Sequence, residues 1–254
     1  MPIARRNGFK VAYEVFGDGP PVVLHPGMFQ VGSHWSRAGY TSALAAAHTV
    51  ITVDPLGLGG SDAPEDPAAY ALARRAEYVT AVLDDAGVDR AAYWGYSLGA
   101  LTGYGVALYA PERLTRLVAG AFDPIDGFRT AVDALLAHFG LPADTDPYPL
   151  MKQGALADPE LAAVIEAVPP VALRANFAAI RYEPGVRARL ADTGVPMLMY
   201  AGTADPWHGP VREFARQTGR GFFSVPDADH LGGWSRSAEI LPHVLPFLAG
   251  GQEA

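Results

Sequence analysis

The chain contains no cysteine, which excludes disulfide bonds, thiolate catalysis and cysteine-based metal sites. Lysine is almost as scarce, with only Lys10 and Lys152 present, and the formal net charge is −8 at pH 7. Because a surface that binds phosphates needs clustered Lys and Arg, we expect no nucleic-acid partner.

Long apolar runs are also lacking. The N-terminus reads Met1-Pro-Ile-Ala-Arg-Arg and has no apolar stretch of the kind a secretion signal needs. No later run approaches the roughly 20 apolar residues of a membrane span. We therefore expect a cytoplasmic protein with no membrane partner. The seven histidines are dispersed, without H-x-H or H-E-x-x-H spacing, so neither a metal nor another cofactor is expected.

What the chain does contain is typical of a compact globular protein. Half of its 254 residues are apolar and 18% are charged. Short apolar runs alternate with helical patterns, which favours an α/β fold with a mostly parallel central sheet flanked by helices. The predicted strands are 11–16, 21–24, 50–53, 91–94, 117–121, 196–201 and 221–225. The predicted helices are 68–86, 98–109, 211–217 and 240–248.

The stretch 124–193 interrupts this alternation. It holds amphipathic helical patterns at 130–139, 159–167 and 171–182, and no convincing strand. We interpret 124–193 as a helical cap, or lid, inserted into a core domain made of 1–123 and 194–254.

A G-x-S-x-G pattern stands in the segment Tyr93-Trp-Gly-Tyr-Ser-Leu-Gly99, directly after a predicted buried strand and before a predicted helix. The sharp turn that this setting requires leaves no room for a Cβ at Gly95 or Gly99. Ser97 would then project at the end of the strand, beside the free N–H groups of the helix N-terminus. Ser97 is the candidate nucleophile; the alternative is a serine that only caps the helix.

The stretch 93–113, which ends Tyr109-Ala-Pro-Glu-Arg, resembles the nucleophile elbow and following helix of the α/β-hydrolase superfamily. The resemblance extends over nearly the whole chain except the cap. It implies the α/β-hydrolase fold and a triad in the order Ser, acid, His. This superfamily includes esterases, lactonases, carbon–carbon hydrolases, peptidases and some proteins that hydrolyse nothing.

For the triad acid, the resemblance points to Asp205, which follows an apolar run in a G-x-x-D turn. Asp123, after the preceding strand, and Asp229, beside the candidate histidine, are the alternatives. The acid would hold the imidazole in one tautomer and stabilise the imidazolium that forms.

For the base, the resemblance favours His230, in Val225-Pro-Asp-Ala-Asp-His-Leu after the last predicted strand. A capping or buried structural histidine is the alternative interpretation of this position. The remaining histidines fit the pattern less well: His25, His34, His48, His138, His208 and His243.

An oxyanion hole would need two N–H donors. The resemblance assigns one to Leu98 and the other to Met28, with Phe29 as the alternative, although Pro26 departs from the family's His-Gly pattern. The loop 54–62 resembles a turn of the family that braces the site.

These residues predict a serine hydrolase that forms an acyl-enzyme at Ser97 and cleaves a small or medium-sized, largely apolar carboxylic ester or lactone. Its partner would be a small-molecule substrate, with Phe29, Tyr96, Phe177 and Trp207 as candidate pocket walls. Two alternatives stay open: the same triad acting on a carbon–carbon or peptide bond, and a non-hydrolytic lyase, cyclase or ligand-binding protein.

Overall fold

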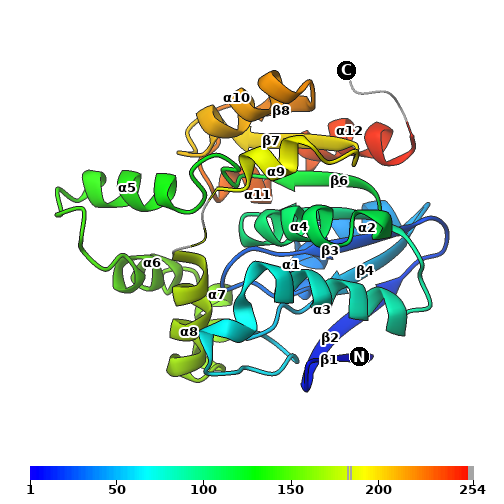
Figure 1. The fold of residues 1–254 in the computed structure, drawn as a ribbon, viewed down its shortest axis with the longest axis horizontal. Coiled ribbons are helices and arrows are strands. Elements are labelled where there is room, and N and C mark those ends of the chain that lie inside the picture. Colours follow the sequence, from blue (N-terminus) through cyan, green and yellow to red (C-terminus); the bar gives the residue numbers. More distant parts are fainter. Residues whose placement is uncertain (182, 184, 251–254) are drawn as a thin grey trace.

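In the computed structural model, residues 1–181, 183 and 185–250 are described. Its central element is one eight-stranded sheet with the order β1-β2-β4-β3-β5-β6-β7-β8 (Figure 1). Strands β1 and β2 pair antiparallel, as do β2 and β4, and every other neighbouring pair is parallel. The strands are β1 (Ile3–Arg6), β2 (Phe9–Phe16), β3 (Pro21–His25), β4 (Thr49–Val53), β5 (Ala91–Tyr96), β6 (Leu114–Gly120), β7 (Met197–Gly202) and β8 (Gly221–Val225).

All residues of β5 and β7 are buried, because helices cover the sheet and neither face meets water. Each predicted strand is found, within a few residues of its predicted bounds. Strand β1 was not predicted: its sequence Ile-Ala-Arg-Arg lacks an apolar run, and only its pairing with β2 at the sheet edge makes it a strand. The predicted fold class is confirmed.

The helices of the core domain pack on the sheet or on one another. Helices α3 (Leu72–Asp85) and α4 (Leu98–Tyr109) pack together, and α4 lies on β5 and β6. Helix α10 (His208–Thr218) packs on β7 and β8, while α12 (Ser237–Leu248) contacts α2 (Tyr40–Ala45) and β8. The shorter elements are α1 (Ser33–Arg37), η1 (Pro67–Tyr70), η2 (Pro111–Arg113) and α11 (Gly232–Ser235).

A helical insertion separates β6 from β7 and projects from one side of the sheet (Figure 1). It comprises α5 (Arg129–His138), α6 (Tyr148–Ala155), α7 (Pro159–Glu166), α8 (Pro170–Arg181) and α9 (Arg187–Ala191). The three predicted cap helices correspond to α5, α7 and α8, except that Tyr182 lies outside the described residues. The short helices α6 and α9 were not predicted.

Helix α8 is attached to the core by a buried arginine. The guanidinium of Arg75 on α3 donates to Asn176 Oδ1 on α8 at 2.6 Å and to the carbonyl of Tyr70 at 2.8 Å. Burial lowers the pKa of Arg75 to about 10, which still leaves it charged at neutral pH. Removing one partner would leave a buried polar group without a hydrogen bond, which is unfavourable. This contact therefore holds the cap against η1 and α3.

No single helix in the described ranges is long and apolar enough to cross a bilayer. The pair α7 and α8 reaches that length and composition only when both are taken together, and they are bent by 107° relative to each other.

Candidate active site

Ser97 lies at the junction of β5 and α4 with φ 55° and ψ −120°, a backbone conformation that residues other than glycine rarely adopt. The turn is tight enough that a Cβ at Gly95 would lie 2.2 Å from the carbonyl oxygen of Gly99. A Cβ at Gly99 would lie 2.0 Å from the carbonyl oxygen of His25. The two glycines therefore allow strand, serine and helix to approach one another at this junction.

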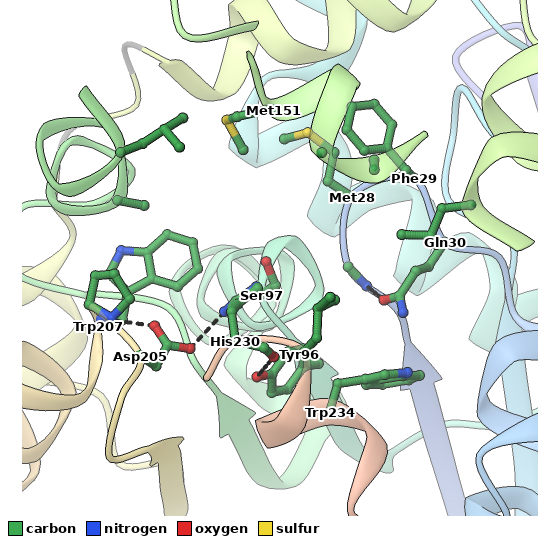
Figure 2. A pocket seen from close by; sticks show the side chains of 18 of the residues that line it. Met28, Phe29, Gln30, Tyr96, Ser97, Met151, Asp205, Trp207, His230 and Trp234 are labelled. Carbon is green, nitrogen blue, oxygen red and sulfur yellow. Dashed lines mark hydrogen bonds and ion pairs between the residues drawn. The ribbon is translucent and has the colours of Figure 1, made fainter. Parts of the chain in front are cut away.

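Asp205 and His230 contact each other directly. Asp205 follows β7, and its Oδ2 lies 2.7 Å from Nδ1 of His230 (Figure 2). Its Oδ1 accepts a hydrogen bond from the backbone N–H of Trp207 at 2.9 Å. The Asp205 side chain is only 1% exposed, so this carboxylate acts on the ring with little screening by solvent. With Nδ1 held by Asp205, Nε2 is the ring nitrogen that can serve a hydroxyl.

The other two candidate acids have different partners. Asp123 accepts hydrogen bonds from the N–H of Ile125 and from Thr130 Oγ1, both at 2.6 Å, at the start of the cap. Burial raises the pKa of Asp123. Asp229 Oδ1 accepts from the N–H of Gly232 at 2.7 Å. Among the described residues, Asp205 is thus the carboxylate bonded to His230.

Aromatic side chains hold the loop that carries His230. The Tyr96 hydroxyl donates to the carbonyl of His230 at 2.6 Å, and burial keeps the Tyr96 pKa far above neutrality, so the donor stays protonated. The imidazole packs against Tyr96 and Trp207, with ring centroids 5.2 and 5.0 Å away (Figure 2). Tyr40 donates to the carbonyl of Trp234 at 2.7 Å. Tyr96 was predicted only as a pocket wall; its hydroxyl contact depends on tertiary structure.

The loop after β3 lies against Ser97. A Cβ at Gly27 would be 3.2 Å from that of Ser97. Two hydrogen bonds close this turn: Gly27 N–H donates to Gln30 Oε1 at 3.0 Å, and Gln30 N–H donates to the carbonyl of Gly27 at 3.3 Å. Phe29 inside the turn has φ 62°. The contact made by Gln30 was not predicted, because no sequence pattern marks it.

In the part of the chain that the structure describes, the backbone amides of the three candidate donors, Met28, Phe29 and Leu98, have no hydrogen-bond acceptor within the protein. Leu98 is the first residue of α4, where the helix dipole favours negative charge. The choice between Met28 and Phe29 therefore stays open.

The loop 54–62 braces this region, as expected. Asp54 Oδ1 accepts from the N–H of Gly32 at 2.8 Å, and its Oδ2 accepts from the N–H of Gly60 at 2.9 Å. One carboxylate thus joins the turn after β4 to the segment that follows the Met28 turn.

His25 is buried beneath the turn, with Nδ1 3.2 Å from the carbonyl of Pro26. Burial lowers the pKa of His25 to about 3, so the ring is neutral under ordinary conditions. His208, close to Asp205 in sequence, has Nε2 2.8 Å from Ser224 Oγ. These contacts give both histidines partners other than Asp205.

Ser97, Asp205 and His230 line a cavity of about 530 Å³ between the core and the cap. From the core, the apolar part of its wall includes Met28, Phe29, Tyr96, Trp207 and Trp234. From the cap, it includes Phe128, Ala131, Ala134, Leu135, Met151 and Ala155. Three of the predicted wall residues are thus present.

Phe177 is different, because the structure does not bring it to this wall. It is buried inside the cap, where its ring centroid lies 5.7 Å from that of Phe128 and 5.0 Å from that of Tyr148. Helical spacing placed Phe177 on an apolar face but did not indicate what that face contacts.

Comparison with known proteins agrees with this fold. A family model described as "alpha/beta hydrolase fold" matches residues 20–142. A crystal structure of a hydrolase from Pseudomonas aeruginosa PA01 is 27% identical, with a TM-score of 0.79 over 97% of both chains. The crystal structure of an enol-lactonase from Burkholderia xenovorans LB400 is 24% identical, with a TM-score of 0.78 over 98% of this chain and 100% of that chain. At this identity the likeness concerns the fold alone.

Among curated proteins, the candidate carbamate hydrolase RutD of Azorhizobium caulinodans is 35% identical over 129 residues. The match covers 50% of this chain and 47% of RutD, so this chain spans about half the length of that relative.

Proposed function

We propose that this chain, which belongs to the α/β-hydrolase fold superfamily, cleaves small or medium-sized, largely apolar carboxylic esters or lactones through an acyl-enzyme at Ser97. The observation that carries the proposal is the 2.7 Å contact between Asp205 and His230 in the wall of the cavity that also holds Ser97.

In the proposed first half-reaction, Ser97 Oγ attacks the carbonyl carbon of the substrate while Nε2 of His230 takes the hydroxyl proton. Asp205 holds Nδ1 and stabilises the imidazolium. The amide of Leu98, with that of Met28 or Phe29, donates to the oxyanion. Collapse of the tetrahedral intermediate expels the alkoxide, which receives the proton from His230.

In the second half-reaction, water attacks the acyl-enzyme and His230 accepts a proton from it. The second tetrahedral intermediate releases the carboxylic acid and returns the proton to Ser97. No atom of the protein is consumed, so the cycle closes with hydrolysis of one ester bond.

Two features support an ester or lactone rather than another bond. The nucleophile position carries serine, whereas the relatives that open epoxides or displace halides use a carboxylate. The cavity wall is mainly apolar, which favours an uncharged substrate and excludes water during acylation. A carbamate, the substrate class in RutD's name, likewise presents a carbonyl bonded to heteroatoms.

A covalent probe tests the mechanism directly. A small p-nitrophenyl alkylphosphonate should label wild-type protein at one site, seen as one adduct by intact mass and located at Ser97 by peptide mapping. Ser97→Ala should give no adduct, and His230→Ala should react slower by orders of magnitude because the serine proton has no acceptor. Wild-type protein that stays unlabelled by several such probes would refute the acyl-enzyme mechanism.

A further inference from the structure

Two cap helices turn matching faces toward the cavity. On α5, Ala131, Ala134 and Leu135 lie at i, i+3 and i+4, and all three line the cavity. On α6, Met151, Gly154 and Ala155 repeat the same spacing and also line it. Figure 2 shows Met151 across the cavity from Ser97. The space that begins at the nucleophile therefore continues between two helical faces made largely of small apolar residues.

The cavity wall offers no permanent positive charge to a substrate. Among the described residues that line the cavity, none is Lys or Arg, and the carboxylates are Asp158 and Asp205. Two histidines also line it: His230, which contacts Asp205, and His138, which is exposed at the end of α5. Asp158 already accepts hydrogen bonds from the N–H groups of Glu160 and Leu161 at the N-terminus of α7. A substrate chain that ended in a carboxylate would thus lose hydration here without gaining a Lys or Arg partner.

We propose that the space between α5 and α6 receives an uncharged hydrocarbon chain of the substrate, that side-chain size at Gly154 and Ala134 sets the longest chain accepted, and that chains ending in a carboxylate are rejected. This inference deepens the proposed function and rests on it for the reaction at Ser97. The substrate class becomes esters with a neutral acyl chain of medium length.

Gly154 offers a clean perturbation. A Cβ added there would meet no protein atom within 4 Å, and its φ is not in the left-handed region. Because glycine inside a helix disfavours the helix relative to leucine or phenylalanine, a larger residue on α6 should not unfold the protein. Gly154→Phe therefore adds a large side chain to the cavity wall without requiring the backbone to move.

The first assay measures kcat/KM on p-nitrophenyl acetate, butyrate and octanoate. Each methylene that leaves water contributes a factor of about four to kcat/KM. If only two of the six extra methylenes of octanoate are buried, the wild type should have a kcat/KM at least about 15-fold higher for octanoate than for acetate. Gly154→Phe should reduce this ratio of octanoate to acetate to below about fourfold. Gly154→Ala and the exposed helical Gly209→Phe on α10 are controls that should keep the gradient.

The second assay tests charge. We expect the mono-p-nitrophenyl ester of suberic acid to react at least about 30-fold more slowly than the octanoate, because no Lys or Arg among the described lining residues can pair with its terminal carboxylate. Ala134→Lys should narrow that gap by about 10-fold or more, whereas the neutral Ala134→Gln should leave it unchanged. A purely structural effect of either variant would not change the ratio of the two substrates.

A binding measurement separates this inference from the proposed function. Methyl octanoate and methyl butyrate can be titrated into the inactive Ser97→Ala protein, with the fluorescence of Trp207 and Trp234 in the cavity wall as the signal. The chain site is supported if methyl octanoate binds more tightly than methyl butyrate and Gly154→Phe abolishes this difference. That result would stand even if the wild type hydrolysed no ester and the proposed function failed. Hydrolysis without chain-length dependence, or a gradient that survives Gly154→Phe, overturns the inference and leaves the proposed function intact.

Discussion

Replacing Asp205 with Asn tests which carboxylate orients the candidate base. In the structure, Oδ1 of Asp205 accepts from the N–H of Trp207 and Oδ2 contacts Nδ1 of His230. An asparagine that keeps its oxygen on Trp207 must turn its NH₂ group toward Nδ1. That ring nitrogen would then have to accept, which puts the proton on Nε2, and His230 in this tautomer cannot take the proton of Ser97.

The charge lost in Asp205→Asn adds to the tautomer effect. Taking an effective dielectric constant near 20 and charge centres about 4 Å apart, the carboxylate stabilises the imidazolium by about 4 kcal/mol, or about 10³ in rate. In a comparable triad the Asp→Asn change, which removes the charge and the productive tautomer together, has cost about 10⁴ in kcat. We therefore expect kcat to fall by about 10³ to 10⁴, measured as initial rates on p-nitrophenyl butyrate.

The matched control is Asp123→Asn. Asp123 contacts Ile125 and Thr130 at the start of the cap, so its replacement should change kcat by less than about 10-fold, although it could lower stability. Circular dichroism and thermal unfolding would verify that both variants fold. If Asp205→Asn kept activity within about 10-fold while Asp123→Asn lost about 10³, the assignment of the acid would be refuted.

Three further perturbations have defined outcomes. Tyr96→Phe removes the donor to the carbonyl of His230 and should lower the free energy of unfolding in urea by about 1–3 kcal/mol and also lower kcat; unchanged values of both would mean that this contact is unimportant. Burial lowers the pKa of His25 from 6.5 to about 3, so below pH 6.5 the unfolded chain binds the proton before the folded chain does. Stability therefore decreases as the pH is lowered, by about 2 kcal/mol at pH 5. His25→Gln should lack this part of the loss between pH 7 and 5, and an equal loss in both proteins would contradict it. Gly99→Ala places a Cβ 2.0 Å from a backbone oxygen and should cost at least about 2 kcal/mol or prevent folding, measured by thermal unfolding; a wild-type melting temperature would argue against the tight turn at Ser97.

Local features of the structure could be predicted from the sequence because the residues that determine them are neighbours. The turn at Ser97 is an example, since strand, glycines and helix lie within a few residues and their sterics leave one arrangement. The buried strands were also predictable, because a strand covered on both faces must be continuously apolar. Strand β1 and helices α6 and α9 were not predicted, because they span only four, eight and five residues and depend on packing partners.

By itself, the sequence determined the class of fold, the position of Ser97 on its turn and a short set of acids and histidines. Only the tertiary structure decided which of these carboxylates contacts His230. Asp123 and Asp205 follow adjacent parallel strands at the same edge of the sheet, so sequence alone could not tell which carboxylate reaches His230. The same reason explains Phe177: it is apolar and at a helical spacing, but contact with the cavity depends on how the cap docks on the core, a long-range arrangement that no local pattern encodes.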